Sequence, residues 1–189
     1  MKIQIEYIVV LIMLIVTGFM TSCDPNDYQI EWGLSKVYIP QAVNSGSTYY
    51  SVPTGNNYSV DSVNNKININ LGVYRSGLQK LESFTVNVGI DNDTINKLIT
   101  DAALTNTVLM TSDIYTIPQK VTVPDGSRDV TFNLSLDKTK LTTFYNTAGN
   151  SGLSMALAVY ISNPTKYELN PTISKVIVVV DVAKVLGLP

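Results

Sequence analysis

Histidine is absent from the 189 residues, and cysteine occurs only once. Without histidine the chain cannot use Ser-His-Asp or Cys-His catalysis, and a single cysteine excludes both an internal disulfide and a Cys/His zinc site. Charged residues are also scarce, at 15% of the chain. The 13 Lys and Arg nearly balance the 15 Asp and Glu, which gives a net charge of −2. This balance lacks the basic surface that nucleic-acid binding requires, so we expect no nucleic-acid partner.

An apolar run near the N-terminus indicates a secretion signal. Residues 8–20 are almost wholly apolar and follow Lys2. As a helix these residues would span about 20 Å, which is less than the ~30 Å hydrocarbon core of a bilayer. A signal peptide is therefore favoured over a membrane-spanning helix.

The cysteine lies directly after this run, behind the small residues Thr21 and Ser22. The arrangement resembles a bacterial lipobox, which implies that Cys23 is acylated and begins the mature protein. The alternative is an ordinary signal peptide with an incidental cysteine. We expect a lipoprotein signal peptide at 1–22 and the acylated cysteine with its tether at 23–33. Acyl chains contribute about 0.8 kcal/mol per buried CH₂, so several of them anchor a protein durably in a membrane.

Two acidic residues, Asp24 and Asp27, follow the cysteine within the tether. Acidic residues at this place resemble the surface-export signal of Bacteroidetes lipoproteins. This resemblance implies a lipid anchor in the outer membrane, with the domain exposed at the cell surface.

Alternation of apolar and polar residues predicts strands along most of the remaining chain. The clearest alternating segments are 67–74, 84–91, 130–136 and 155–161, with weaker ones at 36–39, 47–60 and 114–123. Segment 173–182 is apolar on both faces, which predicts a central strand or a covered edge. One short helix is expected at about 93–103, capped by Asn92 or Asp93. The pattern predicts an all-β sandwich of seven to eight strands with one short helix, in a single domain over 34–185.

The order of these segments resembles a known family. The segments that carry the likeness are 37–42, 84–96, 115–118, 121–127, 129–141 and 167–171. Together they resemble domain of unknown function 1735, the immunoglobulin-like N-terminal module of Bacteroidetes surface lipoproteins. The resemblance covers roughly 35–183 and implies a surface role in glycan handling or adhesion. In the family a second domain often follows the module, and no functional residue can be carried over from it.

Acidic residues are the only candidates for catalysis or metal binding. Glycosidases need two facing carboxylates, and the glutamates Glu31, Glu82 and Glu168 cannot be paired from sequence. The segment 91–94 (Asp-Asn-Asp-Thr) offers oxygen ligands of the kind that Ca²⁺ prefers, but it lacks the glycine and the distal glutamate of an EF-hand. Helix capping explains the same residues. We therefore expect no enzymatic activity, no metal and no cofactor.

Aromatic residues are the strongest candidates for binding. The chain has 11 tyrosines, four phenylalanines and one tryptophan, and sugars stack on exposed aromatic rings. The glycan-binding candidates are Trp32, Tyr49, Tyr50, Tyr58, Tyr74 and Tyr160. The alternative is that tyrosine is simply favoured in strands. By contrast, Tyr38, Tyr115 and Tyr167 are expected in the core or at a corner.

Two short triplets suggest covalent modification. Asp61-Ser62-Val63 and Asp93-Thr94-Ile95 resemble the Bacteroidetes O-glycosylation motif, which makes Ser62 and Thr94 candidate acceptors. The alternative for Thr94 is that it opens the helix.

These observations predict a non-catalytic lipoprotein that binds glycan or serves as an accessory component of a polysaccharide-utilisation system. Its partners would be the membrane, through the lipid anchor, a polysaccharide, and other surface proteins. The alternative is a structural or adhesion component, similar to a fimbrial protein, that acts by strand addition at an open sheet edge.

Overall fold

The computed structural model describes residues 34–43 and 49–188. The expected signal peptide, Cys23, the tether and Trp32 lie outside the described residues. Within the described part of the chain, no helix is both long and apolar enough to cross a membrane.

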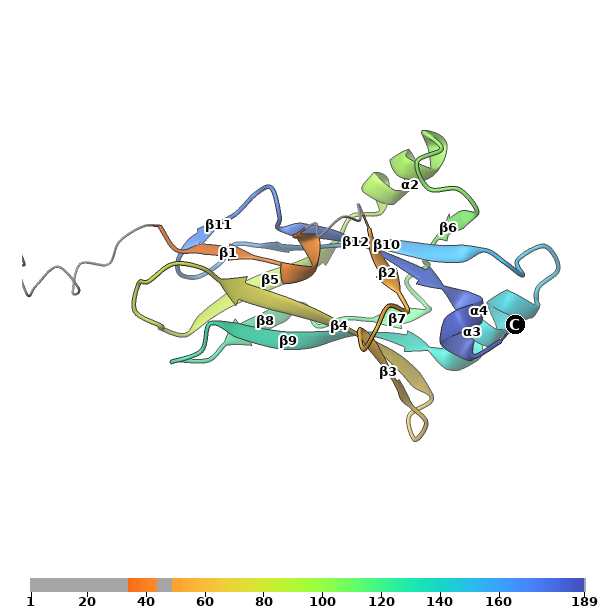
Figure 1. Ribbon diagram of the computed structural model, residues 1–189, viewed down its shortest axis with the longest axis horizontal. Coiled ribbons are helices and arrows are strands. Elements are labelled where there is room, and N and C mark those ends of the chain that lie inside the picture. The colour runs from red at the N-terminus through yellow and green to blue at the C-terminus, as the bar shows by residue number, and fades with distance from the viewer. Residues whose placement is uncertain (1–33, 44–48, 189) are drawn as a thin grey trace, which may run out of the picture. The chain divides into compact units, whose positions relative to one another are not determined.

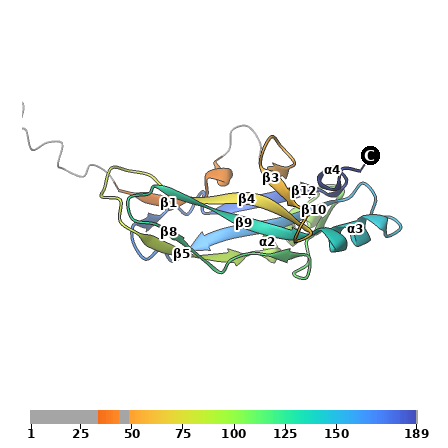
Figure 2. The ribbon, with the colours of Figure 1, turned by 90° about the horizontal axis from the view of Figure 1, so that it is seen from below.

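The described residues form two six-stranded sheets that pack face to face (Figures 1 and 2). Sheet A has the order β11-β1-β4-β9-β7, and β3 also pairs with β4. Its strands are β1 (Lys36–Tyr38), β3 (Tyr58–Asp61), β4 (Lys66–Arg75), β7 (Tyr115–Thr116), β9 (Asp129–Asp137) and β11 (Glu168–Leu169). Sheet B has the order β2-β12-β10-β5-β8, and β6 also pairs with β10. Its strands are β2 (Tyr50–Val52), β5 (Phe84–Ile90), β6 (Thr107–Leu109), β8 (Lys120–Val123), β10 (Ser154–Ser162) and β12 (Lys175–Asp181).

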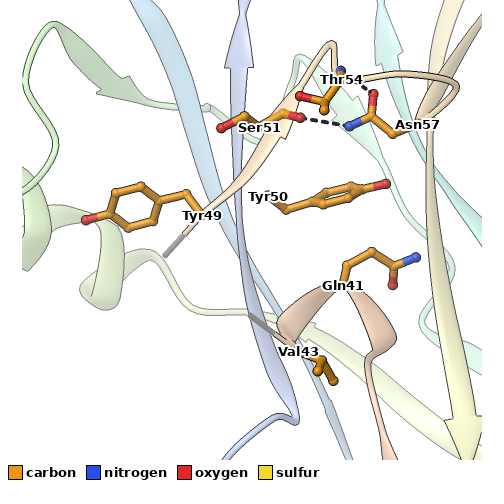
Figure 3. A pocket seen from close by; sticks show the side chains of 7 residues that line it. All are labelled: Gln41, Val43, Tyr49, Tyr50, Ser51, Thr54 and Asn57. Atoms are coloured by element: carbon orange, nitrogen blue, oxygen red, sulfur yellow. Dashed lines mark hydrogen bonds between the residues drawn. The ribbon is translucent and has the colours of Figure 1, made fainter. Parts of the chain in front are cut away.

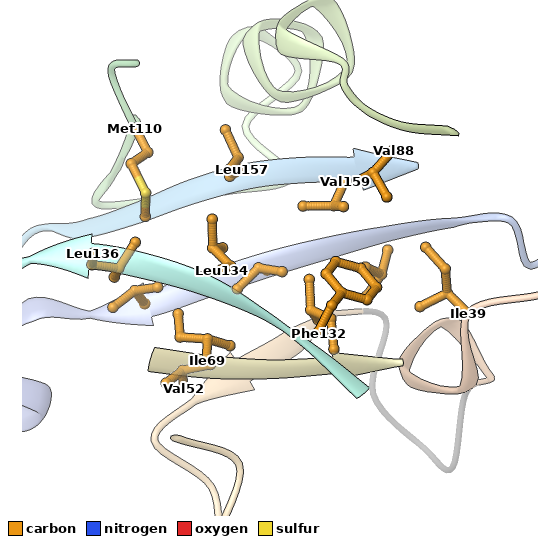
Figure 4. Packing of buried hydrophobic residues seen from close by; sticks show 14 of the residues in the cluster. Ile39, Val52, Ile69, Val88, Met110, Phe132, Leu134, Leu136, Leu157 and Val159 are labelled. Carbon is orange, nitrogen blue, oxygen red and sulfur yellow. The ribbon is translucent and has the colours of Figure 1, made fainter. Parts of the chain in front are cut away.

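The core lies between the sheets and is built from the apolar phase of the alternating strands (Figure 4). Ile69 on β4 pairs with Leu134 on β9, and both side chains are fully buried. Leu157 and Val159 of β10 face them from sheet B. Burial of such side chains contributes about 1.5–3 kcal/mol each, so this layer is the main source of stability. The predicted all-β sandwich is confirmed.

Strand β12 is central, as its apolar sequence predicts. It lies between β2 and β10, and Val178 on its inner face is fully buried in the core. On its outer face, Ile177 and Val179 pack in a second cluster beneath helix α2 (Asn92–Thr100). Both faces of β12 are therefore covered, which explains why no polar alternation is seen there.

The number of strands differs from the prediction, because twelve are present in the described residues where seven or eight were expected. Segment 47–60 contains β2 and β3, separated by a turn, and segment 114–123 contains β7 and β8. Strands β7 and β11 are each only two residues long. Such short strands exist because a neighbouring strand lies beside them, which local alternation cannot show.

The helices also differ from the prediction. Helix α2 begins one residue earlier than expected, and its cap is Asp91, whose carboxylate accepts a hydrogen bond from the Thr94 amide. Two further helices are present, α3 (Lys138–Asn146) and α4 (Val182–Leu186), together with a 3₁₀ turn, η2 (Pro40–Ala42). Both helices directly follow a strand, where an aspartate caps the first turn. The strand predicted at 130–136 is β9, which ends at Asp137, where α3 is capped.

The end of the domain where β1 begins lies opposite the end that carries α3 and α4 (Figure 1). At the β1 end, the fully buried Arg75 donates to the Ser35 hydroxyl and to the Gln79 carbonyl. Its guanidinium carbon also lies 4.7 Å from the centre of the Tyr167 ring. Arg75 thus joins the start of β1 to the 76–83 connection by hydrogen bonds and a cation–π contact.

Candidate functional site

The five described tyrosines that were predicted to bind glycan lie in different surroundings. Tyr49 and Tyr50 point to opposite sides, as expected for neighbours in a strand (Figure 3). Tyr49 packs against the cluster under α2, and its hydroxyl donates to the Ala103 carbonyl over 3.3 Å. Tyr50 packs against the main core, and its hydroxyl donates to the Asn70 carbonyl over 3.1 Å. The Tyr50 hydroxyl therefore joins sheet B to sheet A.

Both residues nevertheless line an open hollow of about 310 Å³ at the β2 edge (Figure 3). Gln41 and Asn57 also line this hollow. The Asn57 side chain donates to the Ser51 carbonyl and accepts from the Thr54 amide, so its amide is already used by the turn. The ring of Tyr50, the Gln41 side chain and the Ser51 and Thr54 hydroxyls are part of the lining.

Tyr58 and Tyr74 lie on opposite faces of sheet A. Tyr58 is opposite Ile69 and packs against the core. Tyr74 points outward and lies 5.3 Å from the ring of Tyr38, at a tilt of 48°. Tyr38 was predicted to lie in the core or at a corner. It does not lie in the core, because the alternation of β1 places the buried Val37 and Ile39 on the other side. Tyr115 packs against the core and Tyr167 against Phe84 at the Arg75 corner, as expected.

Tyr160 lies beside a polar hollow on the outer face of sheet B. It lies on β10 between Gly89 of β5 and Lys175 of β12. Its neighbours in sequence, Val159 and Ile161, point into the core, so Tyr160 points outward beyond the part of the sheet that α2 covers. The hollow beside it has a volume of about 590 Å³. Its lining residues are Ile90, Asp91, Asn92, Asp93, Tyr160, Ser174 and Lys175.

The ring of Tyr160 lies directly over Gly89. A Cβ atom built on Gly89 would fall 2.5 Å from the Tyr160 hydroxyl oxygen and 2.7 Å from Cε1. Only glycine leaves room for the ring at this distance, since carbon atoms in contact normally lie about 3.5–4.0 Å apart. One face of the ring therefore rests on the strand. The Tyr160 hydroxyl has no hydrogen-bond partner among the described residues.

An ion pair forms one wall of this hollow. The Lys175 ammonium group donates to a carboxylate oxygen of Asp91 over 2.5 Å and to the Thr94 hydroxyl over 3.1 Å. The Thr94 hydroxyl in turn donates to Asp91 over 2.7 Å. The hydrogen bonds from Lys175 and Thr94 hold the pKa of Asp91 well below its usual range. Asp91 therefore stays ionised and fixes the position of Lys175 beside Tyr160.

Sequence reasoning identified Tyr160 but missed Gly89, Ser174 and Lys175. Their role depends on the register of three strands, which joins residues some 70 and 15 positions apart in the chain. The one local signal was the glycine within the alternating segment 84–91, since glycine in a strand often marks a close approach.

The acidic segment 91–94 acts as a helix cap in the structure. Asp91 holds the first turn of α2, and no group of three metal-ligating side chains occurs in residues 34–43 and 49–188. The other acidic candidates in the described residues are engaged by lysines, with Glu82 paired to Lys166 and Glu168 to Lys36.

The two candidate glycosylation acceptors differ in accessibility. Ser62 lies at the exposed tip of the hairpin that joins β3 to β4, next to Val63, which is 92% exposed. The Thr94 hydroxyl is already engaged by Asp91 and Lys175 within the first turn of α2. Modification of Ser62 and of Thr94 stays a prediction, and the geometry favours Ser62.

Comparison with known proteins defines the class of this module. A family model of an N-terminal domain matches residues 34–168. The fold also matches solved structures from Bacteroides. One is a multidomain protein of Bacteroides ovatus that includes domain of unknown function 1735, at 18% identity and a TM-score of 0.50, covering 78% of this chain and 45% of that one. The chain belongs to the domain of unknown function 1735 family, as the order of its sequence segments predicts.

Two further solved structures were found to be similar. A Bacteroides ovatus protein is 19% identical with a TM-score of 0.55, covering 77% of this chain and 46% of its own. An auxiliary nutrient binding protein of Bacteroides thetaiotaomicron is 20% identical with a TM-score of 0.48, and the match covers 74% of this chain and 46% of that one. The matched part is thus less than half of each of these structures. The sequence matches none of the curated proteins compared with it.

Proposed function

We propose that this protein is a cell-surface lipoprotein that binds glycan at the hollow beside Tyr160. The observation that carries the proposal is the outward tyrosine ring that rests on Gly89, with amide, hydroxyl and charged side chains around it. Binding sites for small molecules combine an apolar contact surface with a few fixed polar groups, and this hollow has both.

The chemistry of the hollow suits a sugar. An aromatic face offers a flat apolar surface for the C–H groups of a sugar ring, and the Tyr160 hydroxyl is free to donate. Asn92 can both donate to and accept from sugar hydroxyls, while Ser174 adds a hydroxyl. Asp91 and Lys175 neutralise each other, which leaves the negative charge of Asp93 among the residues that line the hollow. This charge favours a neutral glycan over an anionic one.

The anchor completes the proposal. Acylation of Cys23 would hold the domain at the outer membrane, with the segment up to residue 33 as the tether. The protein would then collect glycan at the cell surface as an accessory component of polysaccharide utilisation. Activity would be binding alone, without cleavage of the glycan.

Native affinity electrophoresis on gels that contain single polysaccharides tests the proposal. Residues 24–189 should be retarded by at least one neutral polysaccharide, and Tyr160→Ala should abolish the retardation. Tyr74→Ala is the matched control, because it removes an outward tyrosine from the opposite sheet. Retardation that survives Tyr160→Ala would move the site elsewhere, and the absence of retardation by every polymer would contradict glycan binding.

A second candidate function, strand addition, rests on the edge of sheet A. Strand β3 pairs with β4 on one side and with no strand of the described residues on the other. Val60 on this strand is 45% exposed, and Val63 beyond it is 92% exposed. An open edge with exposed apolar side chains is a template for an incoming strand. Val60→Lys should abolish capture of a protein partner if this edge binds one.

A further inference from the structure

Three hollows on this domain adjoin one another through shared residues. The hollow beside Tyr160 shares Lys175 with a second one, of about 340 Å³. The second shares Gln41 and Tyr50 with the hollow at the β2 edge shown in Figure 3. The three hollows therefore adjoin in a row, called the path below, that leads from Tyr160 past Lys175 to Tyr50.

The register of the strands explains why this path is open. Strand β2 pairs only with Val178–Val180 of β12, so the start of β12 is left without this neighbour. Lys175, Val176 and Ile177 at this uncovered edge line the second hollow, together with Pro171 and Thr172 of the preceding turn. The 3₁₀ turn η2 supplies Gln41 on the other side.

The length of the path follows from strand geometry. Tyr160 pairs with Lys175 and Tyr50 pairs with Val178, so their Cα atoms are three residues apart along β12 and two strand spacings apart across it. Tyr160 points to the outer face of sheet B, whereas Tyr50 packs against the core on the inner face, so the path bends round the uncovered edge of β12. With about 3.3 Å per residue and about 4.8 Å per strand spacing, the separation is about 14 Å. This exceeds the size of one sugar ring.

Polar groups are distributed along the whole path. The Gln41 side-chain oxygen accepts from the Gly72 amide over 3.0 Å, which fixes the side chain, while its NH₂ group has no partner among the described residues. Thr172 adds a hydroxyl on the exposed turn between β11 and β12. The middle and the far end of the path can therefore donate hydrogen bonds to sugar hydroxyls, as the Tyr160 end can.

We infer that the ligand of this site is the interior of a glycan chain, bound along three adjoining subsites, rather than a single sugar or a chain end. The inference rests on the proposed function and adds the class of glycan. The hollows beside Tyr160 and Tyr50 are both open, so a chain can continue beyond either end. The hollow beside Tyr160 supplies the aromatic contact. The two hollows that share Gln41 supply hydrogen bonds that only a longer chain reaches.

Isothermal titration of the full-length protein in detergent, with fragments of increasing length from the polysaccharide that retards it, tests this. We expect affinity to rise at least tenfold from the shortest binding fragment to one that spans the path, and then to level off. Gln41→Glu keeps the oxygen that accepts from Gly72 but removes the NH₂ donor, and it should weaken only the long fragments, by about three- to tenfold. Gln119→Glu, on an exposed connection, is the matched control.

The outcomes separate this inference from the proposed function. Thr172→Ala serves as a second variant at the middle subsite, where the exposed turn tolerates the change, and it should reduce long-fragment binding in the same way. Affinity that is independent of length, with both variants neutral and Tyr160→Ala still disruptive, would overturn the inference and leave the proposed function standing. If no fragment of any length binds, both are overturned.

Discussion

Replacement of Gly89 by alanine tests whether the position of the Tyr160 ring matters. The new methyl group would lie 2.5 Å from the ring hydroxyl and 2.7 Å from Cε1, and closer still to Cζ. Because the obstructing atoms belong to a side chain, the ring would swing away while the strand keeps its place. The ring would then no longer present the same face to the hollow.

The expected loss can be estimated from the contact area. A sugar ring stacked on tyrosine buries about 60 Å² of apolar surface, which at about 25 cal/mol per Å² is about 1.5 kcal/mol, or roughly tenfold in affinity. The free energy of unfolding should change by about 1 kcal/mol or less, since alanine is tolerated in strands.

Affinity electrophoresis measures the binding, and urea unfolding followed by circular dichroism measures the stability. Thr131→Ala is the control, because Thr131 is an exposed residue of β9, on the opposite sheet. It should leave the binding unchanged. Unaltered glycan affinity of Gly89→Ala, in a protein that still folds, would refute the assignment of the Tyr160 ring.

Three other predictions concern stability and anchoring. Asp91→Asn keeps the oxygen that caps α2 but removes the ion pair with Lys175, and should cost about 0.5–1 kcal/mol at pH 7 because the pair is partly exposed. Folding lowers the pKa of Asp91, so the stabilisation by this pair is present above the ordinary value of 3.8 and fades as the pH falls below it. In urea unfolding, the difference in unfolding free energy between the wild type and Asp91→Asn should therefore be smaller at pH 3 than at pH 7. An equal difference at both pH values would contradict the reasoning. Leu157→Ala should lower the free energy of unfolding by about 2–5 kcal/mol, because Leu157 is fully buried. Leu78 is 69% exposed, so Leu78→Ala should lower it by less than about 0.5 kcal/mol. Similar losses in the two variants would argue against the described core. Cys23→Ser should move the protein from the detergent phase to the aqueous phase in Triton X-114 partition, and a variant that stays with the detergent would exclude the lipid anchor.

The long strands could be predicted because their alternation is local. Strands β4, β5, β9 and β10 each have one face in the core and one face outward, so the sequence itself carries the period of two. Strand β12 was recognised as covered on both sides for the same reason. The predicted architecture of two packed sheets follows from these five strands.

The short strands and two helices could not be predicted because they depend on neighbours. In α3 only Leu141 is fully buried, so no apolar stripe shows in the sequence. In α4 the helix continues the apolar run of β12 without a break, and only the cap by Asp181 marks the change. Strands of two residues, such as β7, form where β9 lies beside them.

The site was predicted only in part. The outward direction of Tyr160 followed from the polar phase of its strand, whereas its contact with Gly89 and Lys175 required the register of three strands. Tyr49 and Tyr50 were predicted as candidates because they are adjacent, but their hydroxyls are held by the Ala103 and Asn70 carbonyls, which sequence could not show.

An NMR titration of ¹⁵N-labelled residues 24–189 with the glycan that retards the protein tests the central claim most directly. The account predicts that amide shifts cluster at Gly89, Asn92, Tyr160 and Lys175, around the hollow on sheet B. Shifts confined to the opposite face, around Tyr74, would contradict it.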